Sequence, residues 1–198
     1  ALAADAHGKN HFHQSSLASC CKEMNVMIAD GSIIRCSKET ECDLFWSTVG
    51  GLGLTGLIIS ATFQLQRITG SSFEVTTKSF SRFSCLFEAL KIASENNEYA
   101  VAWLDLLSEK QPGRGIVKCA HLDRNRNLEQ GRVGTRSINF PLSSSINFIT
   151  RPICTIHNSL KYAFSQLTRG TAITPISDFL FPLDRVRNWN NLYGKAGL

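Results

Sequence analysis

Four glycines, Gly50, Gly51, Gly53 and Gly56, crowd into the seven residues immediately before the apolar run at 57–65. The run predicts a strand that is buried on one or both faces. Glycines this close together indicate a chain that bends sharply or a backbone that lies against something flat. The segment lacks the Gly-Lys-Ser/Thr ending of a phosphate loop, and the order helix, glycines, strand is not that of a dinucleotide fingerprint. On the pattern alone it is either a tight helix-to-strand junction or a wall that faces a ligand.

Residues 1–16 form a second unusual stretch, in which small apolar residues precede His7-Gly8-Lys9-Asn10-His11 and His13. This composition suggests backbone close to a ligand rather than a packed helix. Three histidines on an irregular segment, without a matched carboxylate, do not make a metal site, so no metal is expected. A hydrogen-bonding or cationic cluster beside an anionic cofactor or an electron-rich ring fits better, and a purely structural role for His7 stays open.

The first third of the chain also predicts a hairpin. Residues 22–28 and 32–36 have strand character, and Asp30-Gly31 between them is a strong turn signal. Ser37 is expected to cap a short helix that includes residues 43–46.

Beyond a hinge expected at 69–72, the pattern changes to strand, helix, strand, strand. The strands are expected at 73–80, 99–107 and 115–122, and an amphipathic helix at 83–95. Residues 146–167 have intermittent helical periodicity that is interrupted near Arg151-Pro152. The order indicates an α+β fold.

Composition excludes several classes of protein. The net charge of +5 is scattered, without a basic stripe, so nucleic-acid binding is not expected. The seven cysteines lack CxxC spacing, which argues against zinc and favours a reducing compartment. The sequence has no apolar run long enough for a transmembrane helix, and a location in the cytoplasm or at the periphery of the cell envelope is expected. The ends of the chain suggest an excerpt from a longer protein.

Four strings carry a resemblance to a known family: AADAHGKNHFHQSSLAS, ADGSIIRCS, DLFWSTVGGLGLTGLIISAT and FLFPLDRVRNWNNLYGKAGL. They resemble the decaprenylphosphoryl-β-D-ribose 2-oxidase family, whose members have an FAD-binding domain of the p-cresol-methylhydroxylase (PCMH) type. The resemblance is dense over 1–66, sparse over 70–170 and clear again over 178–198.

The resemblance implies an α+β fold in which residues 1–69 are the C-terminal part of the FAD-binding PCMH-type domain and 70–198 are part of a substrate-binding domain. It implies FAD as the cofactor and an oxidoreductase that acts on a CH–OH group, by hydride transfer to the flavin. The cofactor contacts that it implies are Ala4, Asp5, Ala6, His7, Gly53 and Ile58, and the catalytic residues are His7 and Lys9. His7 as the general base is a hypothesis.

The resemblance also implies a substrate, which is C2 of a polyprenyl-phosphoryl ribose, a cell-wall arabinan precursor, with a short-chain reductase as a partner that completes an epimerisation. Leu52 stands where the family more usually has a polar residue, and Leu180 and Phe181 where it often has a tyrosine and a histidine in the pocket. These departures leave an aldonolactone or sugar-alcohol oxidase open. An alternative of another class is a catalytically degenerate flavin-fold binding protein.

Overall fold

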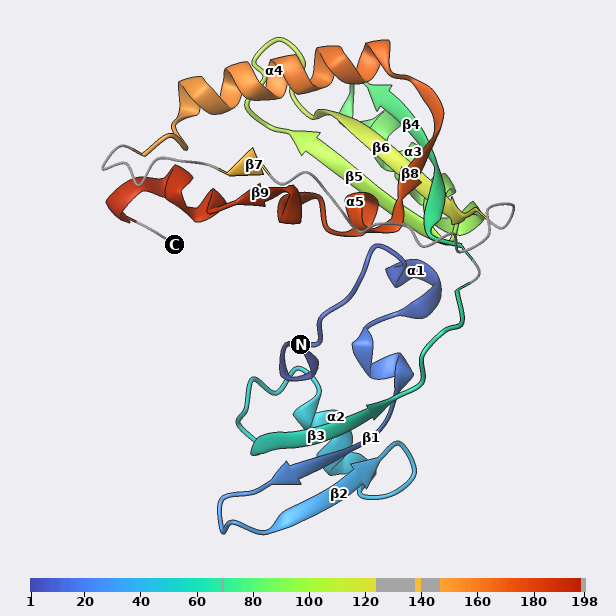
Figure 1. The fold of residues 1–198 in the computed structure, drawn as a ribbon, viewed down its shortest axis with the longest axis vertical. Helices are drawn as coiled ribbons and strands as arrows, with labels where there is room; N and C mark the ends of the chain where they lie inside the picture. The colour runs from blue at the N-terminus through green and yellow to red at the C-terminus, as the bar shows by residue number, and fades with distance from the viewer. Residues whose placement is uncertain (69, 124–137, 140–146, 197–198) are drawn as a thin grey trace. The chain divides into compact units, whose positions relative to one another are not determined.

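The computed structural model of the chain describes residues 1–68, 70–123, 138–139 and 147–196. These residues form two compact units, Ala1–Arg67 (unit 1) and Ile68–Leu198 (unit 2), which are drawn in Figure 1. Thr69, the first residue of the expected hinge, lies outside the described residues. Each unit has its own sheet and its own hydrophobic core.

Unit 1 contains a three-stranded antiparallel sheet in the order β2-β1-β3. Its elements, in chain order, are η1 (Leu2–Ala4), α1 (His11–Gln14), η2 (Leu17–Cys20), β1 (Cys21–Met27), β2 (Ile33–Ser37), α2 (Cys42–Thr48) and β3 (Leu57–Phe63). Gly31, in the turn between β1 and β2, takes a φ of 85°, which favours glycine. The predicted hairpin is therefore confirmed.

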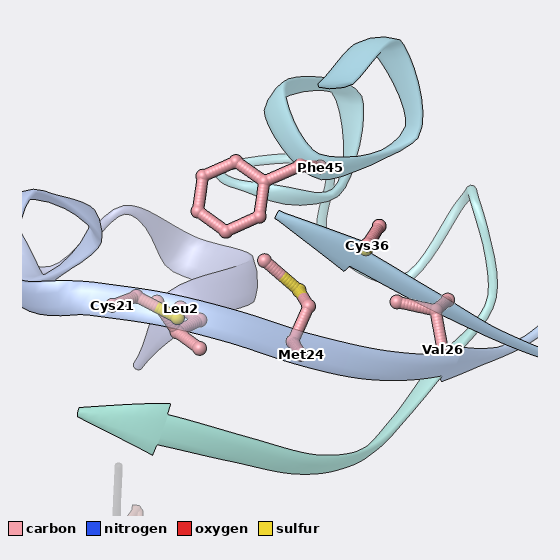
Figure 2. Close-up of a cluster of buried hydrophobic side chains, with 6 residues drawn as sticks. All are labelled: Leu2, Cys21, Met24, Val26, Cys36 and Phe45. Atoms are coloured by element: carbon pink, nitrogen blue, oxygen red, sulfur yellow. The ribbon is translucent and has the colours of Figure 1, made fainter. Parts of the chain in front are cut away.

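The core of unit 1 lies between the sheet and α2. Figure 2 shows Phe45 of α2 directed toward Met24 of β1, with Cys36 on the neighbouring strand. Leu2 belongs to the same buried cluster, although it comes from the first turn of the chain. Burying a side chain of this size stabilises a fold by about 1.5–3 kcal/mol, so Leu2 anchors the residues that follow it.

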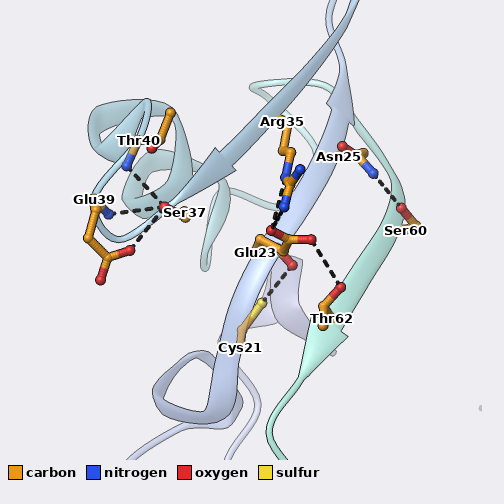
Figure 3. A network of polar contacts seen from close by, with 9 residues as sticks. All are labelled: Cys21, Glu23, Asn25, Arg35, Ser37, Glu39, Thr40, Ser60 and Thr62. Atoms are coloured by element: carbon orange, nitrogen blue, oxygen red, sulfur yellow. Dashed lines mark hydrogen bonds and ion pairs between the residues drawn. The ribbon is translucent and has the colours of Figure 1, made fainter.

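The polar side chains of the sheet in unit 1 pair across its strands. Figure 3 shows Glu23 of β1 accepting hydrogen bonds from Arg35 of β2 and from Thr62 of β3, and the Arg35 Nε donor lies 2.9 Å from Glu23 Oε2. Asn25 Nδ2 donates to Ser60 Oγ at 2.8 Å in the same way. Cross-strand pairs of this kind contribute roughly 0.2–1 kcal/mol each and help to fix the register of the three strands.

One expectation for unit 1 is wrong. Ser37 does not cap a helix, because its Oγ accepts hydrogen bonds from the N–H groups of Glu39 and Thr40 and closes a turn, and α2 begins only at Cys42.

The apolar run forms β3, which packs one face against the core through Ile58, Ala61 and Phe63, in line with a strand buried on one face. Its other face is open, with Leu57 60% and Ile59 49% exposed, and the strand lies at the edge of the sheet. An apolar run does not reveal whether a strand is central or at an edge.

We expect iodoacetamide to modify Cys42 and Cys85 in the folded protein long before Cys21 and Cys36. The first two thiols are exposed, and the second two lie in the core of unit 1. Burial raises the pKa of both core thiols, so less of the reactive thiolate is present at neutral pH. Mass spectrometry after timed labelling measures the order, and equal rates at all four sulfurs would contradict a closed core.

Unit 2 is built on a four-stranded antiparallel sheet in the order β5-β6-β4-β8. Its elements, in chain order, are β4 (Ser72–Phe80), α3 (Phe83–Asn96), β5 (Tyr99–Asp105), β6 (Arg114–Leu122), β7 (Ile138–Asn139), α4 (Arg151–Leu167), β8 (Gly170–Pro175), α5 (Ile176–Leu180), η3 (Pro182–Arg185), β9 (Val186–Arg187) and η4 (Trp189–Ala196). Mixed helices and antiparallel sheets confirm the α+β prediction at this level.

Helices cover both faces of the sheet in unit 2. On one face, Leu86 of α3 packs with Val117 of β6. On the other, Phe179 of α5 packs against Phe73. Side-chain alternation along β5 puts Asp105 on the face of Tyr99, and α4 contacts that carboxylate. Figure 1 shows α4, in orange, running along the sheet. Among the described residues, no helix has both the length and the apolarity needed to cross a membrane.

A buried ion pair joins β5 and β6, and α4 is hydrogen-bonded to it through Asn158. Asp105 is 1% exposed, and its Oδ2 accepts a hydrogen bond from Arg114 Nε at 2.8 Å. Its Oδ1 accepts from Asn158 Nδ2 on α4, at 2.8 Å, and from the backbone N–H of Leu107, at 3.0 Å. Burial alone would raise the pKa of Asp105, but these hydrogen bonds and the charge of Arg114 together lower it below its ordinary value.

Candidate functional site

The first residues of unit 1 form a tight, exposed backbone turn. In η1, the N–H of Asp5 donates to Leu2 O at 2.9 Å, and Asp5 itself takes the left-handed conformation at the end of the turn. Ala4, Asp5 and Ala6 are all exposed. Leu2 is buried in the core of unit 1 and anchors this turn. The residues that follow it have small side chains, so much of the exposed surface of the turn is backbone.

The glycine segment is hydrogen-bonded to that turn. The N–H of Gly50 donates to Leu2 O at 3.1 Å, and the N–H of Leu52 donates to Ala3 O at 2.8 Å. The two segments that the sequence analysis singled out separately therefore lie side by side. At Gly53, which has a φ of 87°, a Cβ would meet nothing within 4 Å, so this part of the segment faces open space.

Gly51 is the point at which the segment passes closest to α2. A Cβ on Gly51 would lie 2.2 Å from Ser47 O, which is backbone and cannot move aside cheaply. We expect Gly51→Ala to destabilise unit 1 by about 1–3 kcal/mol and to free the amides of Gly50 and Leu52 for hydrogen exchange.

Hydrogen exchange followed by mass spectrometry or NMR, together with urea unfolding, measures the effect. Gly53→Ala is the matched control, because its Cβ would enter open space and only the positive φ opposes it. Full protection of the Gly50 and Leu52 amides in Gly51→Ala would contradict the close packing of the segment on α2.

His7 begins a closed loop. It forms an antiparallel bridge with Ser16, and the N–H of Leu17 donates to Ala6 O at 2.8 Å. The residues between His7 and Ser16, which include α1, therefore form a loop whose two ends are hydrogen-bonded together. His7 Nδ1 lies 3.3 Å from Gly8 O. A carbonyl oxygen only accepts, so this contact needs the proton on Nδ1 and leaves Nε2 as the basic nitrogen of the neutral ring.

A cavity of about 450 Å³ opens beside His7 within unit 1. Its side chains carry amide, hydroxyl and thiol groups and no formal charge apart from the titratable imidazole. The lining residues are Ala6, His7, Gly8, Asn10, Gln14, Ser15, Ser16, Leu17, Ser19, Cys20, Gln64, Leu65 and Gln66. Gln64 and Gln66 were not predicted, since their only signal in the sequence is that polar residues alternate with Leu65 at the end of the apolar run. Leu17 and Leu65 belong to the same wall, so the cavity offers uncharged hydrogen-bonding groups beside an apolar surface, as small-molecule sites commonly do.

The other residues that the sequence singled out lie outside the cavity. Lys9 is half-buried and does not line the cavity. Ile58 on β3 is half-buried against the core of unit 1. His7 and His11 stand with ring centroids 4.6 Å apart, yet no group of three or more potential metal ligands occurs within the described ranges. In unit 2, Leu180 packs against the core and Phe181 is 57% exposed.

By sequence similarity, the chain is a homologue of oxidoreductases. It is 28% identical over its whole length to decaprenylphosphoryl-beta-D-ribose oxidase of Mycolicibacterium smegmatis, of which it covers 45%. It is 29% identical over 46% of its length to cytokinin dehydrogenase 5 of Arabidopsis thaliana, covering 15% of that protein.

A third relative carries no activity in its name. The chain is 36% identical, over 59% of its length, to an uncharacterized protein in the mprA 5' region of Streptomyces coelicolor and covers 32% of it. The chain thus spans less than half the length of these curated relatives. No family model matches the chain.

Proposed function

We propose that this chain is part of an FAD-dependent oxidoreductase that oxidises a secondary hydroxyl group of a sugar. The observation that carries the proposal is the pair of hydrogen bonds from Gly50 and Leu52 to the first turn of the chain. They join the two segments to which the family resemblance assigns cofactor contacts. The names of the two relatives, an oxidase and a dehydrogenase, support the same class of reaction.

The residues present fit a flat cofactor ring. Ala4, Asp5 and Ala6 are small and exposed, and the open space at Gly53 leaves backbone accessible beside them. In the proposed enzyme, unit 1 supplies part of the FAD-binding domain, and unit 2 supplies part of the substrate domain. Bound FAD would take up the hydride that leaves the substrate carbon.

The chain's own residues would handle the proton and the charge. Nε2 of His7 is the basic nitrogen in the tautomer that the Gly8 contact requires, and it can accept the proton of the substrate hydroxyl group. Lys9, which lies two residues further along the same loop, supplies a positive charge that stabilises negative charge developing during the reaction. Both groups sit on a loop that the Ser16 bridge closes.

The cavity beside His7 is the proposed place for the sugar. Its amide and hydroxyl groups, from Gln14, Gln64, Gln66 and Ser19 among others, can donate to and accept from sugar hydroxyl groups. A polyprenyl-phosphoryl ribose oxidised at C2 is the leading substrate. An aldonolactone or sugar alcohol is the second candidate, because Leu180 and Phe181 depart from the pattern of the first family.

The visible absorption spectrum of the complete protein tests the proposal. We expect a flavin spectrum that bleaches when polyprenyl-phosphoryl ribose is added under anaerobic conditions. Bleaching by a soluble aldonolactone instead, with hydrogen peroxide formed in air, would favour the second substrate. A complete, folded protein without flavin would overturn the enzyme and leave the binding protein as the alternative.

A further inference from the structure

Another cavity lies within unit 2, where helix α4 leads into strand β8. Its volume is about 360 Å³. It borders the edge of β4 around Thr77, the residue at which the pairing of β4 with β8 ends. Gly170, the first residue of β8, takes a φ of 118°, and a Cβ there would meet nothing within 4 Å, so this wall of the cavity is open. The lining residues are Thr76, Thr77, Lys78, Ser79, Phe80, Arg169 and Gly170.

Arg169 is held at this cavity by two neutral acceptors. Its Nε donates to Ser79 Oγ at 3.0 Å, and its Nη2 donates to Gln166 Oε1 at 2.9 Å. Neither acceptor carries a charge, so the guanidinium is positioned while its positive charge is not neutralised. A guanidinium has more N–H donors than these two contacts use, so Arg169 can still donate to a ligand.

The cavity carries positive charge that no neighbouring carboxylate balances. Lys78 is the second cation of the lining, and none of the described lining residues is an aspartate or glutamate. Within the described part of the chain, Arg114 and Arg151 each pair with a carboxylate, but neither Lys78 nor Arg169 does. The C-terminal end of α4 adds only about half a negative charge. Two cations therefore leave the cavity with a net positive charge.

Hydrogen-bond donors can reach the cavity from both faces of the sheet and from the edge of β4. Lys78 and Ser79 are consecutive in the strand, so their side chains leave opposite faces. Ser79, with Arg169 bonded to it, lies on the face of Trp103, which α4 contacts. Beyond Thr77, the N–H groups of β4 that point away from β6 have no partner in the ladder of the sheet. Cations and backbone N–H groups are the donors that hold phosphate groups in proteins.

We propose that this cavity binds a phosphate group, with Arg169 and Lys78 as its charged donors. A tetrahedral phosphate offers oxygens in several directions, whereas a carboxylate offers its oxygens in one plane. Donors that converge from two faces and a strand edge therefore fit the phosphate better. The inference rests on unit 2 alone and does not depend on the flavin chemistry.

Isothermal titration calorimetry of the chain with inorganic phosphate, at constant ionic strength, tests the site. We expect saturable binding at phosphate concentrations below about 10 mM. Arg169→Gln and Lys78→Gln should each weaken this binding roughly tenfold, because each removes a charge-assisted hydrogen bond. Arg169→Lys should keep only part of the affinity, because lysine retains the charge but not the planar fork that Ser79 and Gln166 position. Circular dichroism checks that the variants remain folded.

Arg151→Gln is the matched control, because Arg151 is an exposed arginine at the start of the same helix and is already paired with Glu109. It should leave phosphate binding unchanged. Absence of saturable binding in the wild-type chain would overturn the proposal. Equal affinities in Arg151→Gln and Arg169→Gln would also overturn it, since the phosphate would then be an adventitious ion only.

Competition with the bound phosphate identifies the source of the phosphate group. Displacement by glycerol 3-phosphate, but not by vesicles that contain phosphatidylglycerol, would support a soluble phosphate ester as the ligand. Displacement by the vesicles as well would support a lipid headgroup. Displacement by neither would overturn a site for phosphate esters, because the cavity would then accept only the free ion.

Discussion

Replacing Asp105 with asparagine is expected to lower the free energy of unfolding of unit 2 by about 3–5 kcal/mol. The carboxylate is 1% exposed, and it accepts three hydrogen bonds, from Arg114, Asn158 and Leu107. Asparagine has nearly the same shape, but its amide group donates where Oδ1 or Oδ2 accepts. The variant thus leaves the Arg114 side chain, itself only 12% exposed, without its counter-charge.

The effect of Asp105 should also depend on pH. The pKa of Asp105 is lower in the folded protein than in the unfolded chain, where it is about 3.9. Its contribution is therefore complete above the unfolded pKa and is lost as the pH falls through the lower, folded value. Unfolding of the wild-type chain should become easier in this acid range, and the Asp105→Asn variant should lack that part of the pH dependence.

Urea unfolding followed by circular dichroism and tryptophan fluorescence measures both effects. Glu109→Gln is the matched control, because its ion pair with Arg151 is exposed on both sides and should contribute less than about 1 kcal/mol. An Asp105→Asn variant as stable as Glu109→Gln would contradict a structural role for the buried pair. A similar cost at Asp105 and Arg114, with little further loss in the double variant, would confirm that the two act as one unit.

Most helices and strands could be predicted from the sequence, because turn residues and the spacing of apolar residues specify them over a short stretch of chain. The Asp30-Gly31 turn needs a positive φ at Gly31, and the residues on either side have strand character, so the hairpin could be predicted directly from the sequence. The break expected near Arg151-Pro152 is instead the start of α4, since proline is compatible with the first turn of a helix. The edge position of β3 depends on which strands pair, and no local pattern carries that information.

The candidate site could be predicted only as separate pieces. The glycine segment and the residues before His7 each suggested backbone near a ligand, but their junction is made by backbone hydrogen bonds from Gly50 and Leu52, which do not depend on side-chain type. The cavity collects residues from 6–20 and 64–66, which are far apart in the chain. The exposure of the apolar face of α4, which includes Ile156, Leu160 and Phe164, could not be predicted either. The spacing of apolar residues shows that a helix has an apolar face, but not which side of the helix packs on the sheet.

Replacing His7 with alanine in the complete protein is expected to slow the reduction of bound flavin by substrate about 10²–10⁴-fold. The ring lines the cavity, and the contact of Nδ1 with Gly8 O leaves Nε2 free of the proton in the neutral form. Alanine removes this base without filling the cavity.

Anaerobic stopped-flow absorbance measures the rate of this single half-reaction, apart from reoxidation of the flavin. His13→Ala is the matched control, because His13 belongs to the same loop but does not line the cavity, and it should reduce at a rate near that of the wild type. The flavin content of both variants must equal that of the wild type for the comparison to report on proton transfer. An unchanged reduction rate in His7→Ala would rule out His7 as the base, and the hydroxyl proton would then have to leave to another group or to water.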